Sequence, residues 1–205
     1  MNVTLFDYGA GNLHSLAKAL ATPDVLVRVE IDPRRAVNSG TDVLVLPGVG
    51  AFGAAAERLE PGRDAMRAAI LGGLPTIGIC LGMQLLFDES EEGTGCGLGV
   101  IPGRVSRLRA VRVPQIGWNG VEPMPGESLF AMAPLPMAYY ANSYVCRPTD
   151  SSVVTAWTEH EGDHFPAAVR AGRAVGVQFH PEKSSGPGVR FLRAFLDEAR
   201  TMERT

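Results

Sequence analysis

Strand-like and helical segments alternate over the first 90 residues, and this alternation restricts the chain to few folds. Short apolar runs at 2–7, 25–31, 43–46 and 76–79 predict strands, and glycines lie in or just after most of them. Apolar residues at helical spacing follow at 13–20, 51–71 and 81–87, with a break near Pro61 and Gly62. Apolar strands that alternate with helices are typical of a parallel sheet covered on both faces. We therefore expect an α/β fold with a mostly parallel central sheet flanked by helices.

The second half of the chain has a different pattern. It predicts strands at 103–113, 137–147, 153–158, 167–170 and 174–179, the last two joined as a hairpin by residues 171–173. A final helix at 189–201 has one apolar face. Because the 205 residues contain neither a repeat nor a linker, we expect one domain, 1–205, with an additional antiparallel β region.

Charge and composition exclude several classes of protein. The net charge of −3 and the lack of a basic run argue against nucleic-acid binding, since the four arginines within 104–112 alternate with apolar residues as in a strand with one solvated face. The sequence has no apolar segment near the roughly 18 residues that span a membrane, and its start does not look like a signal peptide. Three widely spaced cysteines argue against a disulfide framework and favour the cytoplasm.

The strongest chemical motif surrounds Cys80. It reads G-x-C-x-G and lies between the run at 76–79 and the helical segment at 81–87. This is the pattern of a nucleophile elbow, with sulfur in place of oxygen. Gly78 and Gly82 would let strand and helix cross closely, and the start of the helix would favour a thiolate. The alternative is a buried structural cysteine, which is how we interpret Cys96 and Cys146.

A cysteine nucleophile requires a base, and His180 is the best candidate. It ends the apolar run 175–179 and is followed by Pro181 and Glu182. In an extended segment, residues two apart point the same way, so the Glu182 carboxylate could orient the imidazole. The alternative is an ordinary hydrogen-bonded histidine. His160 and His164 flank a polar turn without an evident third ligand, so we predict no metal site.

Two groups could stabilise an oxyanion beside Cys80. One is the backbone N–H of Leu81, and the other is the loop 47–50, Pro-Gly-Val-Gly, which follows the neighbouring predicted strand. The alternative is a plain glycine turn. A phosphate-binding loop motif is missing, and Gly9-Ala10-Gly11 is not followed by the third glycine of a dinucleotide site, so we predict no cofactor.

With these residues identified, the chain resembles the class I (triad) glutamine amidotransferases, which implies a flavodoxin-like arrangement. The resemblance covers nearly the whole chain, and four segments carry it: 7–13 (DYGAGNL), 46–52 (LPGVGAF), 78–87 (GICLGMQLLF) and 177–184 (VQFHPEKS). The first two, with Lys183, are most similar to the glutaminase subunits of imidazole glycerol phosphate synthase. Glutaminase subunits of other members, such as pyridoxal phosphate synthase, remain an alternative. A stand-alone cysteine hydrolase and a non-enzymatic binding module are two further alternatives.

The resemblance implies roles for individual residues. Cys80 would be the nucleophile, His180 the general base and acid, and Glu182 the residue that orients His180. The loop Gly48, Val49 and Gly50 would hold the substrate and stabilise the oxyanion, together with Leu81. The head group of the substrate, glutamine, would be bound by Gln84, Ser143 and Tyr144.

The resemblance also implies a partner, a cyclase subunit with a (β/α)8-barrel fold that forms a heterodimer with this chain and receives its ammonia. The residues similar to interface positions are Asn12, Trp118 and Lys183. Two positions depart from the pattern, because Gln115 and Asn142 stand where the family often has histidine. These departures leave the three proposed catalytic residues intact.

Overall fold

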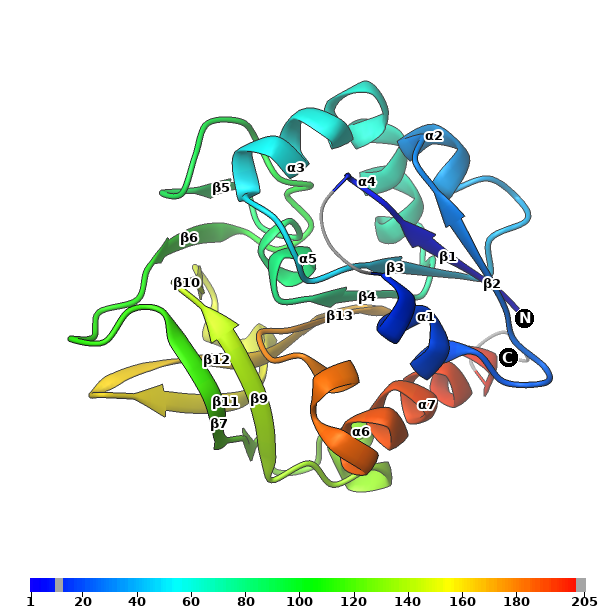
Figure 1. Ribbon diagram of the computed structural model, residues 1–205. Helices are drawn as coiled ribbons and strands as arrows, with labels where there is room; N and C mark the ends of the chain where they lie inside the picture. The colour runs from blue at the N-terminus through cyan, green and yellow to red at the C-terminus, as the bar shows by residue number, and fades with distance from the viewer. Residues whose placement is uncertain (10–12, 202–205) are drawn as a thin grey trace.

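A central sheet of eight strands runs through the computed structural model, which describes residues 1–9 and 13–201 (Figure 1). Five adjacent strands are parallel to one another, and the remaining three continue the sheet in antiparallel fashion. The expected mostly parallel sheet and the 171–173 hairpin are thus confirmed. In spatial order the strands are β2 (Leu26–Glu30), β1 (Asn2–Phe6), β3 (Val43–Leu46), β4 (Thr76–Ile79), β13 (Ala174–Val177), β12 (Asp163–Ala171), β11 (Val154–His160) and β8 (Glu122–Pro123).

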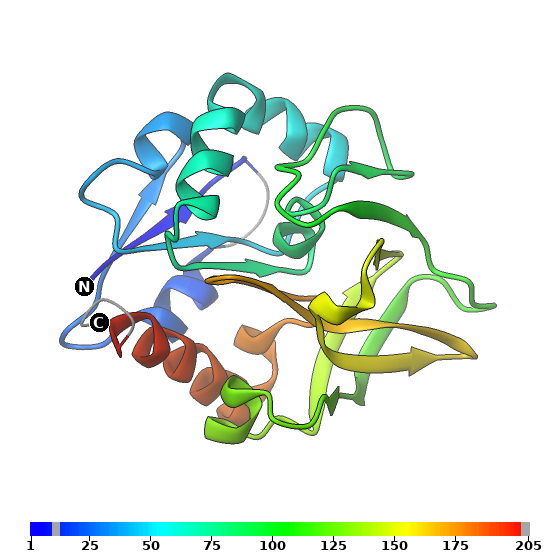
Figure 2. The same ribbon diagram turned by 180° about the vertical axis from the view of Figure 1, so that it is seen from behind.

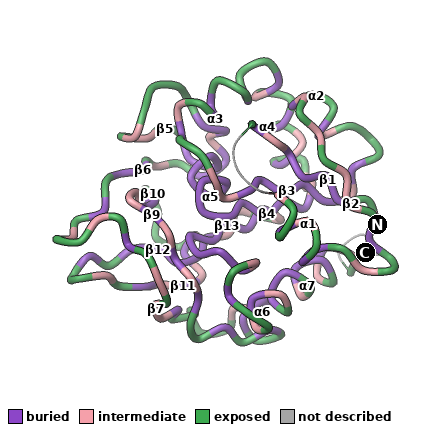
Figure 3. The backbone as a smooth tube through the Cα atoms, in the orientation of Figure 1, coloured by how far each residue is buried: buried purple, intermediate pink, exposed green. Residues whose placement is uncertain are grey.

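Alternate side chains of the parallel strands enter two separate apolar cores, one on each face of the sheet. Val43 and Val45 point into one core, and Leu44 and Leu46 into the other. The first core is covered by α1 (His14–Leu20), α6 (Ser128–Met132) and α7 (Ser185–Thr201). The second is covered by α2 (Pro33–Ala36), α3 (Phe52–Leu59), α4 (Arg63–Leu71) and α5 (Leu81–Gln84), with the 3-10 turn η1 (Glu60–Gly62) between α3 and α4. Figures 2 and 3 show these helices on opposite faces of the buried sheet.

Two small sheets extend the molecule beyond the antiparallel strands. One contains β10 (Tyr144–Pro148), β6 (Gly103–Arg107) and β5 (Glu89–Ser90), and the other pairs β7 (Gln115–Gly120) with β9 (Met137–Asn142). The prediction of one strand over 137–147 was wrong, because the chain changes sheets at Ser143. The strand predicted over 103–113 ends at Arg107, and the helix predicted over 81–87 ends at Gln84. A further 3-10 turn, η2 (Ser151–Val153), precedes β11.

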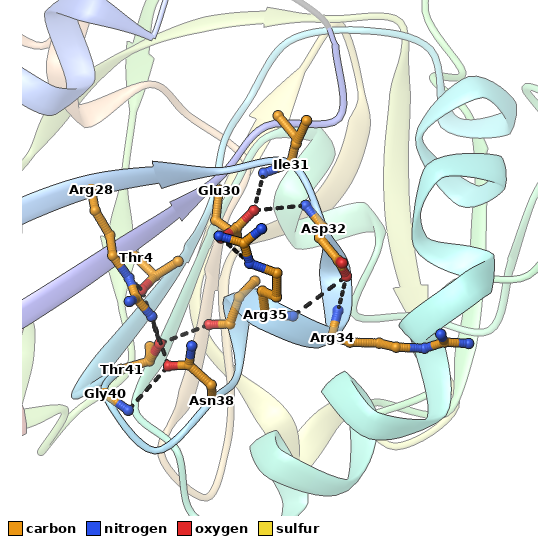
Figure 4. A network of polar contacts seen from close by, with 11 residues as sticks. Thr4, Arg28, Glu30, Ile31, Asp32, Arg34, Arg35, Asn38, Gly40 and Thr41 are labelled. Carbon is orange, nitrogen blue, oxygen red and sulfur yellow. Dashed lines mark hydrogen bonds and ion pairs between the residues drawn. The ribbon is translucent and has the colours of Figure 1, made fainter.

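Polar contacts fasten the outer strand β2, which lies at the edge of the sheet (Figure 4). Arg28 donates from Nε to Thr4 Oγ1 at 2.8 Å and from Nη2 to Thr41 Oγ1 at 2.7 Å. Asp32 caps the adjacent helix α2 by accepting from the backbone N–H groups of Arg34 and Arg35. Arg28 and Thr4 are also partners in the parallel ladder, so the Arg28 contacts add to the backbone pairing of β2 with β1.

Within residues 1–9 and 13–201, no helix combines the length and the apolar character needed to cross a membrane.

Candidate active site

Three loops meet at the carboxyl ends of the neighbouring strands β3, β4 and β13. They carry residues 47–51, Cys80 and residues 178–180, respectively. The carboxyl edge of parallel strands is where open α/β sheets bind ligands. The topology therefore brings together residues that lie as far apart in the sequence as Pro47 and His180.

Cys80 occupies a strained turn between β4 and α5. Its backbone angles are φ 47° and ψ −103°, a conformation that residues with a side chain rarely adopt. The flanking glycines permit this turn. A Cβ atom on Gly78 would lie 2.8 Å from the backbone nitrogen of Met83, and one on Gly82 would lie 2.6 Å from the carbonyl carbon of Leu46. The close crossing expected from the G-x-C-x-G pattern is thus present.

His180 and Glu182 are in contact, but the chain between them is not extended as predicted. Strand β13 ends at Val177, and Pro181–Lys183 form a 3-10 turn, η3. Proline fixes φ near the value of this turn, so it starts the turn rather than continuing the strand. The turn brings Glu182 Oε1 to 2.9 Å from His180 Nδ1, so the predicted pair forms through a different local geometry.

The charge state of His180 depends on its two neighbours. Its side chain is almost completely buried, and this desolvation by itself lowers the pKa. Hydrogen bonds with Cys80 and Glu182, and attraction to both, outweigh that effect and raise the pKa from 6.5 to about 9. The imidazole is therefore protonated at neutral pH, with Nδ1–H donating to the Glu182 carboxylate.

The loop 47–50 packs directly against His180. A Cβ atom on Gly48 would lie only 2.8 Å from Cε1 of the imidazole, so glycine is required there for steric reasons. Gly50 has a φ of 121°, which glycine adopts most readily. The buried Tyr8 hydroxyl donates to the carbonyl oxygen of Pro47 and anchors the start of the loop. Burial, together with the nearby Cys80 and Asp7, raises the pKa of Tyr8 well above its usual value, so it remains a neutral donor.

A cavity of about 260 Å³ opens above Cys80. Glu182 lies behind His180 and does not line it. The cavity brings together every other residue that the sequence assigned to catalysis, the oxyanion or the substrate: Gly48, Val49, Gly50, Cys80, Leu81, Gln84, Ser143, Tyr144 and His180.

Lys183, Ala141, Asn142 and Glu92 also line the cavity. Glu92 was missed from the sequence, because it belongs to a run of acidic residues that looks like a solvated loop. One of its oxygens accepts from the backbone N–H of Phe52 at 2.8 Å, which fixes the carboxylate at the start of α3.

Gln84 and Asn142 support the backbone of this cavity. Both side-chain amides donate to the carbonyl oxygen of Tyr144, at 3.1 Å and 3.2 Å. Gln84 therefore holds the segment that contains Ser143 and Tyr144, and its predicted contact with a substrate head group stays a prediction.

The two departures from the family pattern are direct neighbours. Gln115 on β7 and Asn142 on β9 are paired residues in the antiparallel ladder, and both are buried. Both amide atoms of Gln115 and the amide oxygen of Asn142 lack a hydrogen-bond partner among the described residues. A change at one position therefore alters the surroundings of the other.

The predicted interface residues fall in different places. Trp118 is half exposed on β7 and makes an edge-to-face contact with Tyr139 on β9. Lys183 is exposed on η3, at the rim of the cavity. Asn12 lies outside the described residues.

His160, His164, Cys96 and Cys146 do not line the cavity. His160 contacts the carbonyl oxygen of Arg112, and His164 stacks on Trp157. All three cysteines are free. Cys146 is buried as expected, whereas the expectation of a buried Cys96 was wrong, because it lies in an exposed loop of glycines and polar residues.

Comparison with known proteins agrees with this geometry. The family model "Glutamine amidotransferase class-I" matches residues 4–199. The chain is 46% identical to a protein of Symbiobacterium thermophilum over 93% of this chain and 91% of that one. It is 42% identical to a protein of Halobacterium salinarum over 96% and 93%, respectively. Both are named "Imidazole glycerol phosphate synthase subunit HisH".

Solved structures with low sequence identity have the same fold. A structure titled "Crystal structure of glutamine amidotransferase" has a TM-score of 0.74 at 21% identity. The match covers 97% of this chain and 98% of that chain. The structure of PurLQS from Thermotoga maritima has a TM-score of 0.71 at 17% identity, covering 96% of this chain and 98% of that chain. With the family model matched over nearly its whole length, the chain belongs to the class I glutamine amidotransferase family.

Proposed function

We propose that this chain is the glutaminase subunit of an imidazole glycerol phosphate synthase. It hydrolyses glutamine to glutamate and ammonia and supplies the ammonia to a cyclase subunit, in histidine biosynthesis. Relatives that are 38–46% identical over most of their length carry the name of this subunit. The proposed glutamine hydrolysis rests on one observation: Cys80, His180 and the loop 48–50 line the same cavity.

The first half of the proposed reaction forms a thioester. The Cys80 thiolate attacks the side-chain amide carbon of glutamine, and the amide oxygen becomes an oxyanion. The N–H of Leu81 can stabilise this charge, since the first N–H groups of α5 have no acceptor within the helix. A second donor comes from the loop at Val49. The His180 imidazolium then protonates the leaving nitrogen, the C–N bond breaks and ammonia departs.

The second half hydrolyses the thioester. Neutral His180, held in place by Glu182, removes a proton from water, and the hydroxide attacks the acyl carbon. The C–S bond breaks, the electron pair returns to sulfur, and glutamate is released. The thiolate and imidazolium are then ready for the next cycle. These steps use only side chains and backbone groups of this chain.

The lining of the cavity suits the head group of glutamine. Glu92 presents a carboxylate that can accept hydrogen bonds from an α-ammonium group. Ser143 and Tyr144 supply backbone and side-chain groups for the α-carboxylate, and Gln84 holds their backbone in place. We propose that these four residues select an amino acid rather than a simple amide.

We propose that the partner has a (β/α)8-barrel fold and covers the mouth of the cavity. Ammonia that escaped into water would be protonated and would lose its nucleophilicity. An apolar surface lies beside the cavity on β7 and β9, where Ile116, Trp118 and Met137 are 68%, 52% and 47% exposed, respectively. Large exposed aromatic side chains beside a polar rim are typical of interface anchors. We propose that Lys183 and Asn12 also belong to this contact. The chain then binds the cyclase as a single domain, 1–205, and the complex works in the cytoplasm.

The test measures glutamate release by the purified chain, with and without a cyclase subunit. We expect Cys80→Ala to abolish glutamate release while the complex still forms its product from ammonium salts. Loss of both activities, with the complex intact, would refute this division of labour. Activation by the synthase subunit of pyridoxal phosphate synthase, and not by the cyclase, would favour the alternative partner.

A further inference from the structure

Gln178 lies beside the nucleophile, and the mechanism above does not use it. It follows the last residue of β13 and precedes His180 by two positions. Its side chain is completely buried, and Nε2 lies 3.5 Å from Sγ of Cys80 in a hydrogen bond. Its Oε1 atom is also buried and has no hydrogen-bond partner among the residues that the structure describes. The sulfur is thus the partner that orients this amide.

A buried amide in this position responds to the charge of the sulfur. An N–H group donates more strongly to an anion than to a neutral acceptor, and the effect is larger where water is excluded. The reversed amide would direct the Oε1 dipole at the sulfur and would repel a thiolate. The observed orientation is therefore the one that stabilises negative charge on Cys80.

We propose that Gln178 is a fourth catalytic residue, which donates a hydrogen bond to the Cys80 thiolate before attack and again when that thiolate leaves the thioester. This inference rests on the proposed function. When water attacks the acyl carbon, the C–S bond breaks and the electron pair goes to sulfur, while His180 takes the proton from water. The amide N–H of Gln178 then stabilises the new anion.

The other groups around the sulfur cannot replace this donor. His180 gives up its proton to ammonia, so it is neutral in the thioester stage, and Glu182 lies behind it. Tyr8 and Cys146 are buried near enough to interact with the charge of Cys80, and burial raises the pKa of both. Glu92 and Lys183 line the cavity, and the carbonyl oxygen of Ala141, 3.9 Å from Sγ, can only accept a hydrogen bond. The Gln178 amide keeps its protons throughout the cycle.

The experiment compares Gln178→Leu and Gln178→Met with the unmodified chain. Both substitutions keep the side-chain volume approximately and remove the donor, and the unbranched Met provides a second variant if Leu perturbs folding. The first measurement is the pH profile of Cys80 alkylation by iodoacetamide without glutamine. We expect the midpoint of the profile to move to higher pH.

The second measurement is rapid-mixing kinetics of the variants in complex with the cyclase subunit. We expect a burst of ammonia before glutamate, with thioester hydrolysis about 10- to 100-fold slower, as for loss of a hydrogen bond to a charged group.

Thr158→Val is the control, because Thr158 is also a buried polar side chain, donates to the carbonyl oxygen of Gly120 and does not line the cavity. It should leave the alkylation profile in place. An unchanged midpoint and unchanged thioester hydrolysis in folded Gln178→Met would overturn the inference. Failure of the unmodified chain to release glutamate would instead contradict the proposed function, and the alkylation profile would still test the role of Gln178.

Discussion

His180 Nδ1 lies 2.9 Å from Oε1 of Glu182, while the other carboxylate oxygen, Oε2, is buried without a hydrogen-bond partner among the described residues. A charged carboxylate that is only half paired is costly to bury, and its attraction to the imidazolium offsets that cost. The contact therefore links the charge of Glu182 to the protonation of His180.

Glu182→Gln keeps the shape of this contact and removes its charge. We expect the pKa of His180 to fall and glutamate release to drop by more than about 100-fold, as when a catalytic histidine loses its orienting carboxylate. The measurement is the turnover number at saturating glutamine in the complex. Ammonium-dependent synthesis should be retained. A variant with nearly full turnover would show that Glu182 does not orient the base.

The raised pKa of His180 predicts how stability depends on pH. Between pH 6.5 and about 9 the folded chain holds a proton on His180 that the unfolded chain has released. This part of the stability is therefore present below pH 6.5 and is lost as the pH rises through about 9. Urea unfolding at pH 6, 7.5 and 9 should show a falling free energy of unfolding. His180→Asn should lack this component, and identical pH slopes in the two proteins would contradict it.

Gly48→Ala tests the packing of the oxyanion loop against the base. The added Cβ would lie 2.8 Å from Cε1 of His180 and 3.1 Å from Cγ2 of Ile79, so either the loop or the imidazole must move. We expect a loss of about 1–3 kcal/mol in stability and at least a 10-fold lower turnover. Gly120→Ala is the control, since its Cβ would meet nothing within 4 Å. Equal effects of the two changes would exclude a specific contact with His180.

Trp118→Ala tests the proposed docking surface. The side chain is half exposed, so its removal should leave the melting temperature nearly unchanged. Affinity for the cyclase subunit should fall roughly 30-fold, corresponding to about 2 kcal/mol for an aromatic anchor. Titration calorimetry of the two purified subunits measures this directly. Leu26→Ala, at an exposed position on the edge strand β2, is the control and should bind the cyclase subunit with unchanged affinity. Equal affinities for the two variants would show that Trp118 is not part of the interface.

The sequence predicted the parts of the site that depend on strand ends and glycines. Cys80, His180 and residues 48–50 follow apolar runs, and parallel strands must bring their carboxyl ends to one edge. Glu92 could not be predicted, because its place in the cavity depends on the backbone of Phe52, 40 positions away. Strand β7 was missed because Gly117 and Gly120 weaken its strand pattern, and its pairing with β9 is a long-range contact.

The backbone N–H of His180 donates to the carbonyl oxygen of Tyr139 at 2.8 Å, and Tyr139 packs against Trp118 on the outer sheet. The backbone of His180 is thus hydrogen-bonded to β9, one of the two strands that form the proposed docking surface. Ala141 and Asn142 at the end of the same strand, and Ser143 just after it, line the cavity. Strand β9 therefore contacts the proposed docking surface, the backbone of His180 and the cavity above Cys80, so a displacement of this strand would reach all three.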